Sequence, residues 1–74
     1  MEFEWDSAKH EENLRTRGIG FDEAALVFEG EVIVWPDTRA DYGELRFNAV
    51  GEVNGKIPRL TYTMRGGVAQ IITA

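Results

Sequence analysis

The sequence predicts a mixed α+β domain: a short N-terminal strand, two helices, then a four-stranded antiparallel meander packed on the helices. Helical periodicity and capping residues are confined to residues 7–30, whereas the β-branched and aromatic pattern typical of strands dominates from Val32 onward. Asn54-Gly55 and Gly66-Gly67 favour two-residue hairpin turns, because both central positions of such turns need a positive φ. Residues 1–74 are therefore expected to form a single domain.

The first half of the chain supplies the short strand and both helices. Residues 2–5 alternate polar and apolar side chains, which predicts a strand with its aromatic residues turned inward. Asp6 can cap a helix over Ser7–Arg17, and Gly18 would end that helix in a left-handed turn. A second helix is expected from Gly20, with acidic residues in its first turn, and would stop at Gly30.

The second half is expected to fold into strands whose pairing follows from the two turns. A strand over Val32–Trp35 precedes a polar loop at residues 37–43. The Asn54-Gly55 turn pairs Val53 with Lys56, and counting outward sorts the strands into two faces. The face expected to pack on the helices comprises Leu45, Phe47, Ala49, Leu60, Tyr62, Met64, Ala69 and Ile71. The same counting pairs Asn48 with Thr61, Arg46 with Thr63, Glu44 with Arg65, Thr63 with Gln70, and Tyr62 with Ile71.

The opposite, mostly polar face carries the candidate functional residues. Arg46 and Arg65 lie on it or beside it, and guanidinium groups suit a phosphodiester because they bind two of its oxygens and stay charged. Asn48, Thr63 and Gln70 lie between them, with Arg59 towards an edge. Half-solvated antiparallel sheets also carry arginines without any function, and Glu44 offers Arg65 a cross-strand ion pair.

Composition excludes several classes of protein. The chain has no cysteine, so it has neither a disulfide nor a cysteine nucleophile, and no apolar run is long enough to span a membrane. The formal net charge of −5 argues against a general nucleic-acid binder, although residues 32–74 alone carry four acids and five bases. His10 is expected on a helix surface rather than in a zinc site, and the two tryptophans, Trp5 and Trp35, in the core. We expect a soluble, cytoplasmic protein without a cofactor.

The order of these motifs resembles the BrnT family, ribonuclease toxins of a bacterial type II toxin–antitoxin system. The matching residues run nearly end to end: Phe3-Glu4-Trp5-Asp6, Lys9, Asn13-Leu14, Gly18, Phe21, Ala24-Ala25, Phe28, Arg46-Phe47, Ala49-Val50-Gly51, Tyr62-Thr63, Arg65-Gly66 and Ile71-Ile72-Thr73-Ala74. The resemblance implies a RelE-like fold, RNA cleavage without a metal, and inhibition by a BrnA-like ribbon-helix-helix antitoxin. It also implies that Arg46 and Arg65 correspond to catalytic arginines of the family.

The sequence departs from the family pattern in three places. A Lys-His-Gly that usually follows the first helix reads Thr16-Arg17-Gly18, and Gln70 stands where an arginine is common. Family members also usually continue into an arginine-rich C-terminal helix, whereas this sequence ends at Ala74, so the chain is C-terminally short relative to the family.

Three hypotheses follow. In the first, the protein is an endonuclease toxin in which Arg46 and Arg65 stabilise the phosphate, substrate-binding side chains orient it, and Lys9 takes the proton if the first helix abuts the sheet. The substrate-binding residues would be Asn48, Arg59, Thr63 and Gln70. In the second, the same fold is a non-catalytic interaction module that binds an antitoxin or forms a dimer. The third is an unrelated small α+β binding domain. The last strand is expected at an exposed edge, so a homodimer or a toxin–antitoxin heterotetramer is expected.

Overall fold

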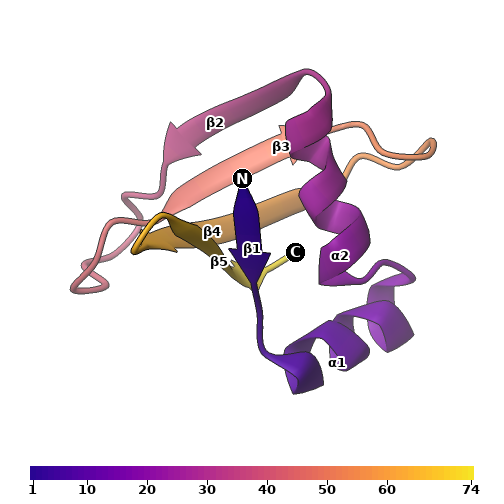
Figure 1. The fold of residues 1–74 in the computed structure, drawn as a ribbon, viewed down its shortest axis with the longest axis horizontal. Helices are drawn as coiled ribbons and strands as arrows, with labels where there is room; N and C mark the ends of the chain where they lie inside the picture. The colour runs from indigo at the N-terminus through magenta and orange to yellow at the C-terminus, as the bar shows by residue number, and fades with distance from the viewer.

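In the computed structural model, which describes all of residues 1–74, α2 and the segment after it pack on one face of a mixed five-stranded sheet, and α1 lies next to α2 at one end (Figure 1). The strands have the order β1-β5-β4-β3-β2, so the strands next to the two chain ends, β1 and β5, are neighbours. The elements are β1 (Glu2–Glu4), α1 (Ser7–Arg17), α2 (Phe21–Ala24), the 3₁₀ segment η1 (Ala25–Glu29), β2 (Val32–Pro36), β3 (Phe47–Gly51), β4 (Arg59–Arg65) and β5 (Val68–Thr73). None of the helices is long and apolar enough to cross a membrane.

The sheet differs from the expected one at its edges. Strands β2, β3, β4 and β5 are antiparallel neighbours, but β1 adds to them as a fifth strand, parallel to β5. The prediction that β5 lies at an exposed edge is therefore wrong, because β1 covers it and leaves β1 and β2 as the edges. The alternation in residues 2–5 predicts a strand, but a local pattern carries no information about the partner across two helices.

The predicted register of the first hairpin is confirmed over Phe47–Val50, where β3 pairs with β4. Asn48 pairs with Thr61, and Ala49 pairs with Leu60. The register of the second hairpin agrees too, with Thr63 opposite Gln70. Both turns have the expected backbone, with φ of 51° and 79° at Asn54-Gly55 and of 57° and 81° at Gly66-Gly67. A register shift between Thr61 and Tyr62, which the sequence did not predict, then sets Thr61 opposite Thr73.

Helix α1 is capped as predicted, and its histidine, His10, accepts a hydrogen bond from the start of α2. The Asp6 side chain accepts hydrogen bonds from the first turn of α1, and Gly18 ends the helix with φ of 74°. His10 is not the plain surface residue expected: its Nδ1 accepts the Phe21 backbone N–H at 3.0 Å, and its ring stacks on Trp5. Because the N-cap residue of α2 makes no side-chain bond, His10 supplies the missing acceptor. The imidazole packs so closely that it would lie 2.4 Å from a Cβ added at Gly20.

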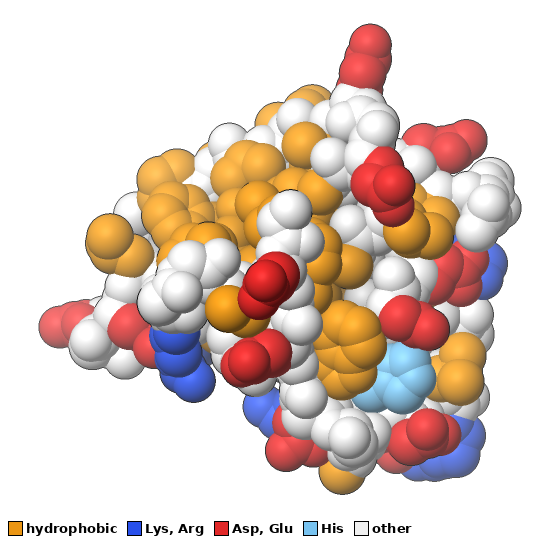
Figure 2. Space-filling model, in the orientation of Figure 1, with side chains coloured by type: hydrophobic (Ala, Val, Ile, Leu, Met, Phe, Trp, Pro, Cys, Tyr) orange, Lys and Arg blue, Asp and Glu red, His pale blue; other side chains and the backbone are white.

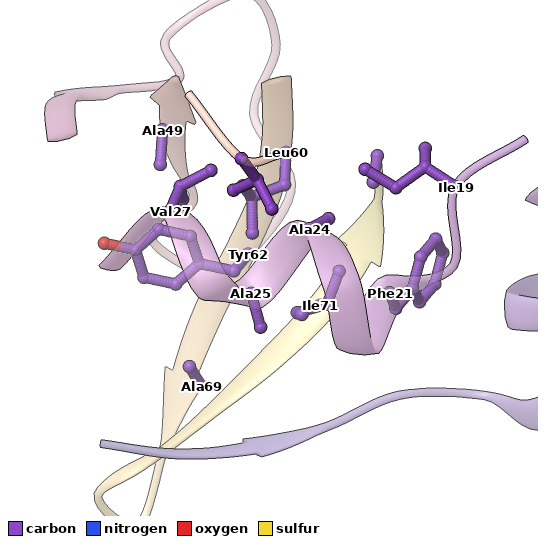
Figure 3. Packing of buried hydrophobic residues seen from close by; sticks show 12 residues of the cluster. Ile19, Phe21, Ala24, Ala25, Val27, Ala49, Leu60, Tyr62, Ala69 and Ile71 are labelled. Atoms are coloured by element: carbon purple, nitrogen blue, oxygen red, sulfur yellow. The ribbon is translucent and has the colours of Figure 1, made fainter. Parts of the chain in front are cut away.

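The core lies between α2–η1 and the sheet. Twelve buried apolar side chains form one cluster, in which Phe21, Val27, Leu60 and Ile71 are the largest fully buried members (Figure 3). The prediction that the whole apolar face packs on the helices is wrong at one end of the sheet. Leu45 is 78% exposed and Met64 is 42% exposed. The four residues of α2 and five of η1 rise only about 16 Å, so they leave that end uncovered.

Candidate functional site

Arg46 and Arg65 converge on one carboxylate. Arg65 ends β4, and its Nη2 donates to Glu44 Oε1 at 3.1 Å. Arg46 directly precedes β3, and its Nε donates to Glu44 Oε2 at 3.2 Å. The cross-strand pair of Glu44 with Arg65 was predicted, whereas the junction of all three side chains was not. The two guanidinium groups therefore lie close enough to contact the same anion.

The electrostatics of this junction favour the ionised form of the Glu44 carboxylate. The hydrogen bond from Arg65 lowers the pKa of Glu44 most, and the one from Arg46 lowers it further. A carboxylate with a lowered pKa is a weak base, so Glu44 is poorly suited to accept a proton. Its role in the site is to hold both guanidinium groups in place. Arg65 is 61% exposed, so it has N–H donors free for a ligand.

The loop before β3 positions Arg46 from the other side. The buried Asp37 carboxylate accepts two side-chain bonds from Arg39, at 2.8 and 2.7 Å, and one from the Tyr42 hydroxyl. The hydrogen bonds from Arg39 hold the pKa of Asp37 well below its usual range. The Arg46 guanidinium lies 4.1 Å from the centre of the Tyr42 ring. The sequence indicated only a polar loop here, because the stacking depends on a loop conformation that no local pattern specifies.

Asn48 and Thr63, which were predicted to bind substrate, are each only 2% exposed. Asn48 Oδ1 accepts the hydroxyl of Thr61 at 2.8 Å, and the Thr63 hydroxyl donates to the Leu45 carbonyl at 2.6 Å. In this structure, the two side chains are therefore engaged within the sheet. Thr63 fixes the segment that carries Glu44 and Arg46, and Gln70, opposite Thr63, is the half-buried neighbour on the same face.

Lys9 and Arg59 lie far from the two arginines. Lys9 shares a shallow hollow with Ile72 and Thr73, so α1 does abut β5, but at its C-terminal end. Arg65 pairs with Val68, about 17 Å of strand away. The structure therefore does not bring Lys9 to the site as the first hypothesis required.

Arg59 begins β4, about 20 Å along the strand from Arg65. Its guanidinium lies 5.4 Å from the centre of the Trp35 ring. Trp35 is half-buried on the sheet face away from the helices, not in the core as predicted. No group of three or more histidine, aspartate or glutamate side chains lies close enough together to hold a metal ion.

These features define the class: a small α+β protein with paired arginines suited to an anion. The family model described as "Ribonuclease toxin, BrnT, of type II toxin-antitoxin system" matches residues 5–74. The chain therefore belongs to the BrnT family, which confirms the resemblance found in its sequence. Membership indicates a ribonuclease toxin and implies an antitoxin partner. A comparison with curated proteins found no match.

Proposed function

We propose that this protein is a metal-independent RNA endonuclease toxin with a RelE-like fold, in which Arg46 and Arg65 bind and stabilise the scissile phosphate. A BrnA-like ribbon-helix-helix antitoxin would neutralise it. One observation carries the proposal: Arg46 donates to one oxygen of the Glu44 carboxylate and Arg65 donates to the other. A carboxylate and a phosphodiester both present two oxygens to guanidinium donors, so the geometry that holds Glu44 is also suited to an RNA phosphate.

The chemistry requires few protein groups. The ribose 2′-oxygen attacks the adjacent phosphorus, the bond from phosphorus to the 5′-oxygen breaks, and the products carry a 2′,3′-cyclic phosphate and a 5′-hydroxyl. One proton leaves the 2′-hydroxyl and one reaches the leaving oxygen. The protein must align the RNA and stabilise the charge that builds on the non-bridging oxygens. In this proposal Arg65 binds one of these oxygens through its free donors, and Arg46 binds the other.

The remaining site residues fall into two groups in this proposal. Gln70 and Arg59 share the sheet face of Arg65 and would contact the RNA strand along it. Asn48 and Thr63 would support the site from within the sheet, since their side chains already bond to protein groups. Lys9 would stay outside the chemical step because of its distance along β5.

The alternative is a non-catalytic interaction module of the same family. It is favoured by the full engagement of Glu44, which partly neutralises both arginines, and by the formal net charge of −5. A single carboxylate leaves most of the ten N–H donors of two guanidinium groups free, which favours the endonuclease.

The deciding experiment is RNA cleavage by the purified chain at low salt with a chelator present. Arg46→Ala and Arg65→Ala should each reduce the rate by about a hundredfold or more, as expected for a lost oxyanion donor. Arg15→Ala is the matched control, because Arg15 is an exposed arginine paired only within α1. Mass spectrometry should find the 2′,3′-cyclic phosphate. A folded chain that cuts no RNA, or arginine variants that cut as well as the control, would leave the interaction module.

A further inference from the structure

An apolar groove opens on the side of the molecule that carries the helices. Figure 2 shows hydrophobic side chains exposed on this side, among acidic ones. Phe3 and Trp5 line the groove from β1 and the segment after it, and Leu26 and Phe28 line it from η1. The Phe3 and Phe28 rings lie 5.5 Å apart. Leu26, at 43% exposure, presents its side chain to solvent.

The lining of the groove is mostly apolar, with six hydrophobic residues out of eight. An exposed apolar groove on a small protein marks a site of interaction. Its lining residues are all different from those around Glu44, Arg46 and Arg65, so the groove is separate from the candidate RNA site.

The charges around the groove are of one sign. Asp22 and Glu29 line it, and the lining includes no lysine or arginine. Residues 1–31 as a whole contain nine acids and three bases. An acidic rim repels nucleic acid. A symmetric dimer through this face would bring the same acids of two copies together, which also disfavours a second copy.

We propose that this groove binds a lysine- or arginine-rich amphipathic helix of a partner protein. The apolar side of the helix would pack on Leu26 and Phe28, and its cations would lie over Asp22 and Glu29. A helix suits the groove better than an added strand does, because β1 has only three residues with which to pair. The inference rests on the proposed function in one respect: it takes this partner to be the antitoxin.

Trp5 provides a direct readout, because it lines the groove. In a Trp35→Phe background it is the only tryptophan of the chain. The probe is a synthetic 18-residue helical peptide with leucines at i, i+3, i+4 and i+7 and lysines on its other face. We expect a saturable change in tryptophan emission on titration. Leu26→Ser should weaken binding at least tenfold, whereas Leu14→Ser, at a leucine of 45% exposure on α1, should leave it unchanged.

Further controls separate the alternatives. Glu29→Lys should weaken binding of the lysine peptide, and a peptide with glutamate in place of lysine should not bind the unmodified groove. Equal binding by a peptide with scrambled leucines, or by Leu26→Ser, would overturn the proposal. So would an emission change that follows protein concentration alone, which would indicate a second copy.

RNA cleavage measured on the same variants keeps the two proposals distinguishable. Leu26→Ser should cleave RNA like the unsubstituted chain if the endonuclease proposal holds. Peptide binding without RNA cleavage would contradict the proposed endonuclease function but support the helix-binding groove. RNA cleavage without peptide binding would support the endonuclease function but contradict the helix-binding groove.

Discussion

Replacing Thr61 with valine should destabilise the protein even though the two side chains have nearly the same shape. The Thr61 hydroxyl donates to Asn48 Oδ1 at 2.8 Å, and both side chains are buried. Valine removes this donor and leaves the amide oxygen of Asn48 without a partner. A buried acceptor left unpaired costs about 1–3 kcal/mol. Each kcal/mol lowers the melting temperature of a domain of this size by about 4–8 °C.

A double-mutant cycle isolates this hydrogen bond. Asn48→Leu removes the acceptor, and the pair Asn48→Leu with Thr61→Val removes both polar groups. Because the double variant leaves neither group unpaired, it should lose less stability than the two single losses added together, with a coupling of about 1 kcal/mol. Urea unfolding followed by circular dichroism measures all four proteins, and equal m-values would show that the unfolded states are comparable.

The same four proteins test whether Asn48 binds RNA, as its place on the polar face indicated. If the side chain acts only within the sheet, Thr61→Val should bind RNA as tightly as the unsubstituted chain does, per folded molecule. If Thr61→Val instead kept its stability but bound RNA more weakly, the reasoning would be refuted and Asn48 would be assigned to substrate binding.

Three further predictions test the packing of the chain. Gly20→Ala should destabilise the domain by about 1–3 kcal/mol because its Cβ would meet the neighbouring imidazole, whereas Gly30→Ala, with open space around it, is the control; equal melts would contradict this. Leu60→Ala should cost about 2–5 kcal/mol, and Leu45→Ala, at an exposed leucine, less than about 0.5 kcal/mol in the same urea titration. The pKa of Asp37 is lowered in the folded protein, so its stabilising effect is present above its usual value of 3.8 and fades as the pH falls below it. The melting temperature should therefore fall more steeply with decreasing pH for the unsubstituted chain than for Asp37→Asn.

The strand pairing could be predicted because two short signals determine it. Asn54-Gly55 and Gly66-Gly67 fix where each hairpin turns, and period-two alternation then sets the faces. The partner of β1 could not be predicted, because no local signal specifies a pairing across α1 and α2. The exposure of Leu45 and Met64 was missed for a related reason. Alternation assigns a residue to a face of the sheet, but it does not say how far a helix extends over that face.

The candidate site also combines features that the sequence could predict with features that it could not. The ion pair between Glu44 and Arg65 follows from the register, whereas the approach of Arg46 to Glu44 depends on its stacking on Tyr42 in an irregular loop. Burial of Asn48 and Thr63 was also outside the reach of pattern reasoning. Their face carries no helix, yet both are buried, with Asn48 bonded to Thr61 and Thr63 to the Leu45 carbonyl.

The distribution of charge reconciles an acidic protein with the RNA substrate that we propose. The acids concentrate in residues 1–31, which form β1, α1 and the helical layer with the apolar groove. Arg59 and Arg65 lie on the sheet face turned away from that layer, and Arg46 joins Arg65 at its end. Within roughly 10 Å, about the screening length at moderate salt, a phosphate at the arginines responds to their local field more than to the net charge. The two proposals are therefore compatible on one small domain, with RNA at the arginines and a basic helix at the groove.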